Sequence, residues 1–386
     1  MKTRFIAMLL VFIMTLGALN GALADSALTV NDAGLELGAG SVHYPQLTGF
    51  GDPLLEATVN QAILDAGAIG ARLDRLALLI GQEESIKTTY AYDAEAFAGG
   101  VFSCVFDTTG LVDSMRGTHV YTAASIDLTT GMPVTLADLF VDKAAAVAAI
   151  EALMWDSVAP ELSAHLQNSE LTPLPDVFTI SDTGITFWYP IRQLSTLSDR
   201  AGAVTVLWCE VLEHLRLGEG TILRRIGAEA NVAPGTKEQL TAALAGRAIP
   251  GVPAVLGGSM QALTDTYRML ADADFYEGGR LFQLEDSAFR GVYVLTDALT
   301  EEWDNSVVHG VRADRVNVCG LMCGATTIDQ WRAMLGAPDA TVTLDGDAAD
   351  AYRLTAGTSD YYTIGDDQLR LHADESGVLR SLFLMD

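Results

Sequence analysis

Positively charged residues are scarce in this sequence. It has 23 lysines and arginines against 50 aspartates and glutamates, which gives a net charge of −27 at pH 7. Nucleic acids and anionic membrane surfaces are bound through basic patches, so this charge disfavours both as partners. Hydrophobic residues make up 49% of the chain. That content excludes a disordered protein and, with the length, indicates about two or three folded domains.

The short motifs of common catalytic sites are also missing. The six histidines form no H-E-x-x-H zinc motif, and the sequence contains no G-x-S-x-G elbow and no S-x-x-K. It contains no P-loop and no G-x-G-x-x-G, which disfavours a nucleotide partner or cofactor. We therefore predict no catalytic residues, no metal site and no cofactor, while a site assembled only by folding stays open.

The chain has one long apolar run, at its start. Phe5–Ala18 is uncharged and mostly apolar, and it is shorter than the ~20 residues of a membrane-spanning helix. Lys2 and Arg4 precede it, and Ala22-Leu23-Ala24 matches a signal peptidase site. We interpret residues 1–24 as a secretory signal peptide, with a retained anchor as the alternative. Its cleavage leaves a secreted or cell-envelope protein that is two charges more negative.

Cysteine is rare, with four in the chain: Cys104, Cys209, Cys319 and Cys323. Disulfides form outside the cytoplasm, and four cysteines allow three pairings. Cys104 and Cys209 fall in strand-like runs of the first half, whereas Cys319 and Cys323 are neighbours in the second. Pairing within each half is therefore the simplest expectation. A single C-x3-C without a nearby histidine does not provide the four ligands of a zinc site.

The first half of the chain predicts helices packed on a sheet. Asp52-Pro53 is typical of a helix start, and apolar residues from Leu55 to Ile80 recur at gaps of three and four. Strand-like runs follow, including Gly100–Phe106, and Asp182-Thr183-Gly184 is typical of a hairpin turn. Residues 25–217 are therefore expected to form an α+β domain with a mainly antiparallel sheet.

The second half predicts a smaller domain of the same class. Residues 218–258 are rich in glycine and proline and contain the capping box Thr236–Gln239, so we interpret them as a linker with one short helix. From residue 259 onward, the clearest element is a helix over Thr327–Leu335, followed by strand-like runs to the end. Residues 259–386 are expected to form an α+β domain of a helix plus an antiparallel meander.

Two residues are candidate ligand contacts. His119 follows Arg116-Gly117-Thr118 at the start of a strand, where the plainer interpretation is a polar loop residue. Trp188 and Tyr189 end a strand before Pro190. Such an aromatic pair forms a binding surface when it is exposed and core packing when it is buried.

Carboxylates are so abundant that paired acids arise by coincidence. A glycosidase needs two carboxyl groups ~5–10 Å apart, one of them with a raised pKa. The run Asp345–Asp350 is superficially similar to a calcium loop, but Gly346 and Ala349 break the EF-hand pattern. We expect a turn with solvated acids there.

Several blocks of the first half match a known family. They are Tyr44–Leu47, Val59-Asn60, Gly117-Thr118-His119, Ile126–Gly131, Val134–Phe140 and Phe178–Ile185. Through them, residues 41–215 resemble the extracellular domain of the bacterial anti-sigma factor that senses lysozyme, a domain also found in a peptidoglycan deacetylase. Arg116 and Thr118 depart from the Gly-Gly-Ala-His run of that family. The resemblance implies extracellular recognition, and the acidic charge suits a cationic protein such as lysozyme.

A second resemblance covers residues 310–386. It is carried by Gly324-x-Thr326-Thr327, Trp331, the Leu335-Gly336-x-Pro338 helix end and Gly377-Val378-Leu379. These residues resemble the small domains of outer-membrane assembly lipoproteins and of the β-lactamase inhibitor protein. The resemblance implies protein binding through a sheet face.

Together these features predict a secreted or cell-envelope binding and recognition protein without catalytic activity. Its expected partner is a cationic extracellular protein or a cell-wall component. One alternative is a cell-wall glycan-active enzyme that uses paired carboxylates, and another is a structural envelope component. A pocket holding two carboxyl groups with shifted pKa values would favour the enzyme, and an exposed patch without a pocket would favour binding.

Overall fold

The computed structural model describes most of the chain after the predicted signal peptide. The described residues are 28–38, 40–81, 85–112, 115–157, 174–189, 203–267, 269–276, 279–284, 291–296 and 305–386. Residues 1–24, the predicted signal peptide, lie outside them. Among the described residues, no helix is both long and apolar enough to cross a membrane.

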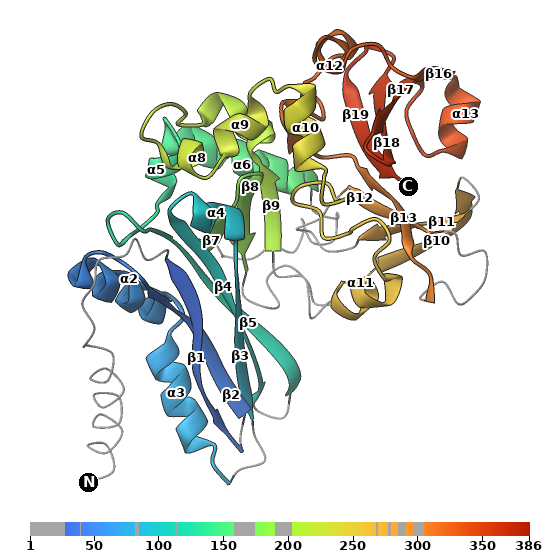
Figure 1. Ribbon diagram of the computed structural model, residues 1–386. Coiled ribbons are helices and arrows are strands. Elements are labelled where there is room, and N and C mark those ends of the chain that lie inside the picture. Colours follow the sequence, from blue (N-terminus) through green and yellow to red (C-terminus); the bar gives the residue numbers. More distant parts are fainter. Residues whose placement is uncertain are drawn as a thin grey trace, which may run out of the picture.

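The first half is built on a six-stranded sheet. Its strands, in spatial order, are β1 (Thr29–Leu37), β2 (Gly40–Thr48), β3 (Ile86–Tyr92), β4 (Val101–Val112), β5 (Met115–Asp127) and β6 (Met132–Pro133). Neighbouring strands are antiparallel except β2 and β3, which run parallel. Helices α2 (Pro53–Ala66) and α3 (Ile69–Leu78) pack on this sheet (Figure 1).

The apolar stripe predicted as one helix is divided between α2 and α3. Asp52 caps α2 by accepting a hydrogen bond from the Leu54 nitrogen, as the sequence predicts. The helix ends at Gly67, where an added Cβ would lie 2.9 Å from the Phe106 ring. Ala68 then adopts the left-handed conformation, with φ 46°, and α3 starts at the next residue. Both helices still bury their apolar side chains against the same sheet. The break changes the direction of the chain, but the apolar side of each helix still faces the sheet.

A three-stranded antiparallel sheet stands next to the end of the first sheet. It consists of β7 (Phe178–Ile180), β8 (Gly184–Trp188) and β9 (Ala203–Leu207), with the predicted hairpin between β7 and β8. Helices α4 (Ala94–Ala98), α5 (Leu136–Leu139) and α6 (Lys143–Ser157) contribute buried residues to the same core. The strand predicted over Val204–Val211 ends at Leu207, and the 3-10 helix η1 (Trp208–His214) follows. The fully buried Trp208 ring donates 2.9 Å to the Ser181 carbonyl oxygen, which holds η1 in this place.

Residues 218–258, predicted as a linker with one short helix, contain three helices. These are α8 (Ile222–Arg225), α9 (Ala228–Val232) and α10 (Lys237–Ala243), and the capping box of Thr236 and Gln239 is present. Leu223 is buried in the core of the first half, whereas Leu240 is buried in the core of the second. Figure 1 shows α10 between the two lobes. The segment therefore belongs to both cores, and the predicted domain limits stay a prediction.

The second half is built on an eight-stranded antiparallel sheet. Its strands, in spatial order, are β10 (Met269–Tyr276), β11 (Gly279–Leu284), β12 (Val292–Thr296), β13 (Val308–Ala313), β19 (Leu379–Met385), β18 (Asp367–Asp374), β17 (Gly357–Ile364) and β16 (Ala340–Leu344). The predicted meander is therefore one part of a larger sheet, in which the last strand lies between β13 and β18. With this sheet, the α+β class with mainly antiparallel strands is confirmed.

Short elements complete the second half. They are α11 (Met260–Thr266), the hairpin of β14 (Asn317–Val318) and β15 (Leu321–Met322), α12 (Ile328–Leu335) and α13 (Gly346–Ala351). Thr327 and Gln330 cap α12 as the sequence predicts. The acidic run predicted as a turn instead forms α13, with Asp345 as its N-cap. In the described part of the chain, no group of three or more metal-ligating side chains gathers.

A buried carboxylate attaches α12 to the sheet. Asp360 is fully buried in β17 and accepts 2.9 Å from the Trp331 ring nitrogen and 2.7 Å from Arg332 Nε. The hydroxyl of Thr341 in β16 also donates to it, at 2.7 Å. These hydrogen bonds satisfy a charge that would otherwise be costly to bury.

Candidate functional site

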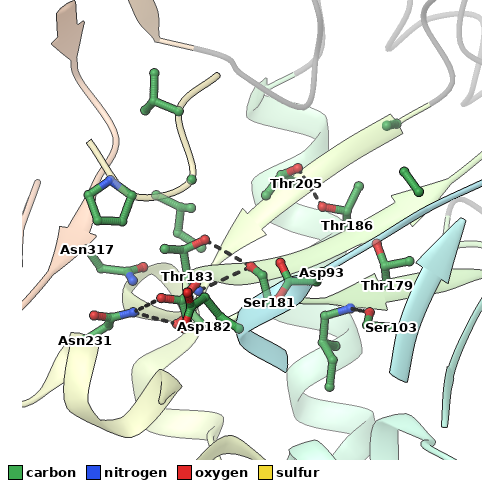
Figure 2. A pocket seen from close by; sticks show the side chains of 18 of the residues that line it. Asp93, Ser103, Thr179, Ser181, Asp182, Thr183, Thr186, Thr205, Asn231 and Asn317 are labelled. Atoms are coloured by element: carbon green, nitrogen blue, oxygen red, sulfur yellow. Dashed lines mark hydrogen bonds between the residues drawn. The ribbon is translucent and has the colours of Figure 1, made fainter. Parts of the chain in front are cut away.

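A cavity of about 840 Å³ lies where the three-stranded sheet meets the second half of the chain. Strands β7, β8 and β9 form one wall, and residues 250–252 with β14 contribute the other side. Figure 2 shows the polar side chains that converge on this space. The volume falls within the range of roughly 300–1,000 Å³ that is typical of small-molecule sites.

A row of threonines lines the wall formed by the small sheet. Thr179 is paired with Thr186 across β7 and β8, and Thr186 with Thr205 across β8 and β9. Because side chains alternate along a strand, all three hydroxyls point to the cavity while neighbours such as Ile185 and Val206 fill the core behind them. The hydroxyls of Thr186 and Thr205 are 2.9 Å apart (Figure 2). Each hydroxyl keeps capacity for a further hydrogen bond.

Trp188, one of the two predicted contacts, lines this cavity. It lies half-buried on the same face of β8 as Thr186. Its ring nitrogen donates 2.9 Å to the Thr179 hydroxyl, and its ring centroid is 5.2 Å from that of Tyr121. These contacts hold an aromatic surface next to the threonine row. Its neighbour Tyr189 is buried in the core instead.

His119, the other predicted contact, is placed only by its backbone. It belongs to β5 and is paired with Thr109 of β4. Its side chain lies outside the described part of the structure, so its role in ligand binding stays a prediction.

Two carboxyl groups with raised pKa values share the cavity. Asp93 caps α4 through a 2.6 Å hydrogen bond from the Ala96 nitrogen, and Asp182 lies in the β7–β8 turn. Burial raises the pKa of Asp93, and the nearby charge of Asp182 raises it further against that hydrogen bond. Burial also raises the pKa of Asp182, although Asn231 Nδ2 donates 2.9 Å to it. Figure 2 shows both carboxyls beside Ser181.

Asn317 places an unpartnered donor in the cavity wall. Its side chain is 1% exposed, and its Oδ1 accepts a long, 3.4 Å hydrogen bond from the Cys209 nitrogen. Among the described residues, its Nδ2 has no hydrogen-bond partner. A buried polar group left unsatisfied costs about 1–3 kcal/mol, so this nitrogen favours a partner such as a water molecule or a ligand group.

The charge of the described lining is acidic. Arg315 is its one basic side chain, and its charge is already paired. Its Nε donates 2.7 Å to Glu210, and its terminal nitrogen donates 3.0 Å to the Thr205 carbonyl oxygen. The carboxyls of Asp93, Glu95 and Asp182 therefore dominate the field in the cavity, which disfavours anionic ligands.

Little in the sequence marks this site. Trp188 was predicted because an aromatic pair ends a strand. Asp93 and Asp182 carry only the signals of a helix cap and a hairpin turn, and Asn317 carries none. The threonine row combines strands whose pairing a single sequence does not reveal.

The structure contains no disulfide bond among the four cysteines, and the expected pairing within each half stays a prediction. Cys104 is buried in β4 among the residues that pack under α2 and α3. Cys209 lies in η1 and packs against the core of the small sheet. Cys319 and Cys323, after β14 and β15, pack against the core of the second half. Burial raises the pKa of both Cys104 and Cys209 to about 12.

Fold and site together define an α+β protein with a polar, acidic cavity between its two halves. No family model matches the chain, and no curated protein matches it. The chain is similar to the crystal structure of a DUF3298 family member from Bacteroides fragilis, with 11% identity and a TM-score of 0.38 over 52% of this chain and 98% of that one. It is also similar to a DUF3298 family protein from Pseudomonas aeruginosa, with 9% identity and a TM-score of 0.36 over 50% and 94%.

A DUF4309 family protein from Bacillus subtilis is more distant, with 12% identity and a TM-score of 0.24 over 38% of this chain and 93% of that one. At such scores these similarities carry no argument about function. The resemblances to the anti-sigma factor, the deacetylase, the assembly lipoproteins and the inhibitor protein stay predictions.

Proposed function

We propose that this protein is a secreted or cell-envelope binding protein that holds a saccharide of the cell wall in the cavity between its halves. The observation that carries the proposal is the Asn317 carboxamide, a buried donor at the cavity wall whose Nδ2 has no partner among the described residues. A ligand acceptor at this position would satisfy that nitrogen.

The other lining groups suit the same ligand class. A sugar presents many hydroxyls that both donate and accept, and the hydroxyls of Thr179, Thr186 and Thr205 do the same. Trp188 adds a flat apolar surface for the faces of sugar rings. The acidic lining favours a neutral saccharide or one with free amino groups, such as a glucosamine unit.

The test is calorimetric titration of the mature chain, from Asp25 onward, with N-acetylglucosamine oligomers, glucosamine oligomers and soluble peptidoglycan fragments. The structure offers a matched pair of variants. Thr186→Val removes a hydroxyl from the Thr186–Thr205 pair in the cavity, and Thr48→Val removes one from the exposed Thr29–Thr48 pair, whose oxygens are 2.8 Å apart.

We expect Thr186→Val to weaken saccharide binding about fivefold to tenfold, the value of one hydrogen bond, and Thr48→Val to bind like the wild type. The proposal is wrong if none of the saccharides binds, or if both variants change affinity equally. Lysozyme belongs in the same titrations. Tight lysozyme binding without any saccharide binding would favour protein recognition on another surface.

A glycan-active enzyme is the second candidate, because one cavity holds Asp93 and Asp182, and such a pair of carboxyl groups with raised pKa values is the feature expected to favour an enzyme. We favour binding because both groups already have structural tasks, one as a helix cap and one as the partner of Asn231. Incubation with peptidoglycan separates the two. New reducing ends that disappear in Asp182→Asn would establish the enzyme and end the binding-only proposal.

A further inference from the structure

Two cysteines from opposite halves of the chain meet at one backbone carbonyl. Cys209 Sγ donates 3.7 Å to the Val316 oxygen, and the Cys323 backbone nitrogen donates 3.2 Å to the same oxygen. Both residues also line one small cavity of about 170 Å³. They are therefore spatial neighbours, although they are far apart in the sequence.

The other two cysteines face different surroundings. Cys104 is fully buried within the six-stranded sheet and its helices. Cys319 lies against the turn before α10, because a Cβ added to Gly235 would be 2.8 Å from the Cys319 Cβ. Its neighbour in sequence, Cys323, instead directs its sulfur toward the Ala313 oxygen, 3.9 Å away. Cys209 is therefore the cysteine whose contacts converge with those of Cys323.

We propose that Cys209 and Cys323 form a disulfide bond that joins the two halves of the protein. Two S–H bonds break and one S–S bond forms, so the cysteines together lose two electrons and two protons. A small-molecule disulfide accepts both through a mixed-disulfide intermediate and leaves as two thiols. The oxidising compartment implied by the proposed export permits this bond to persist.

The location ties this bond to the candidate ligand cavity. Leu207, Arg315 and Val316 line both the small cavity at the cysteines and the large one. The bond would therefore lie directly behind the wall where η1 meets the segment that precedes β14. It would fix the spacing of the two sides of the ligand cavity.

The raised pKa values of the two thiols agree with a disulfide that resists reduction. Burial raises the pKa of Cys209 to about 12, and Glu210 adds to the effect. Burial raises the pKa of Cys323 as well, with further contributions from Asp314 and Cys209. Thiols with a high pKa are poor leaving groups, so the disulfide would resist exchange once made.

The experiment uses the mature chain, equilibrated in vitro with reduced and oxidised glutathione, then alkylated under denaturing conditions and mapped by mass spectrometry. This design does not depend on export or on any ligand. We expect a peptide pair linking Cys209 to Cys323, an intact mass ~2 Da below the reduced form, and alkylated Cys104 and Cys319. Oxidation should also raise the melting temperature, an increase that reductant removes.

Variants make the result specific. The Cys104→Ser/Cys319→Ser double variant keeps only the proposed pair and must still form the link. Cys209→Ser must lose both the link and the effect of reductant on the melting temperature. Alkylation of all four cysteines under oxidising conditions, or a link between Cys319 and Cys323 or between Cys104 and Cys209, overturns the proposal.

Discussion

Replacing Asn317 with leucine should make the protein without ligand more stable and saccharide binding weaker. Leucine has a similar shape and removes the unpartnered Nδ2, whose burial costs about 1–3 kcal/mol. It also removes the acceptor of the long, 3.4 Å hydrogen bond from the Cys209 nitrogen, which is worth about 0.5–1.5 kcal/mol. The expected net gain in the free energy of unfolding is about 1 kcal/mol. A stabilising change that weakens binding is typical of a residue retained for function.

Urea unfolding followed by tryptophan fluorescence measures the stability, and calorimetric titration measures the affinity, which we expect to fall about tenfold. Asn231→Leu is the matched control. The Asn231 amide donates 2.9 Å to the Asp182 carboxylate and 3.1 Å to its backbone oxygen, so its loss should lower stability by about 1–3 kcal/mol.

The reasoning about Asn317 fails if Asn317→Leu unfolds at a lower urea concentration than the wild type and binds saccharide equally well. That outcome would mean that the carboxamide serves the fold and contributes nothing to a ligand.

Three further changes test other parts of the structure. Asp360→Ala should lower the free energy of unfolding by about 1–3 kcal/mol, because it strands the buried Trp331 ring nitrogen and removes the partner of the partly exposed Arg332; an effect below about 1 kcal/mol would contradict this. Leu223→Ala should cost about 2–5 kcal/mol in the same assay, whereas a linker residue would cost almost nothing. Asp182→Asn should stabilise the protein at pH 7, because burial raises the folded-state pKa of Asp182 and its charged form is therefore costly above that pKa. The gain should disappear below about pH 4, where the carboxyl is protonated in both states, and a gain that persists there would argue against burial as the cause.

The sequence predicts the local elements of this fold better than their assembly. The caps at Asp52, Thr236 and Thr327 were predicted because their partners lie within three residues along the chain. The break between α2 and α3 was not, because both helices bury the same face and the apolar spacing continues across it. Residues 218–258 look like a linker because glycine and proline mark turns wherever they stand, whether or not the turns are packed.

The sequence predicts the candidate site even less well than it predicts the assembly of the fold. Its wall depends on Thr179, Thr186 and Thr205 meeting in register, and its other groups come from α4, α9 and β14. Strand pairing and burial set these neighbours, and neither leaves a pattern in a short window of sequence. Trp188 is the exception, because an aromatic residue at a strand end is informative by itself.

The position of β19 has a consequence for how the chain reaches its folded state. This strand hydrogen-bonds to β13 on one side and β18 on the other. Until it is inserted, β10–β13 and β16–β18 are separate half-sheets, each with an open edge that invites pairing with other chains. On the ribosome, the second half therefore cannot close until Leu379–Met385 has emerged from the exit tunnel. Deleting that strand would leave two separate half-sheets with exposed edges, so we expect the variant to aggregate.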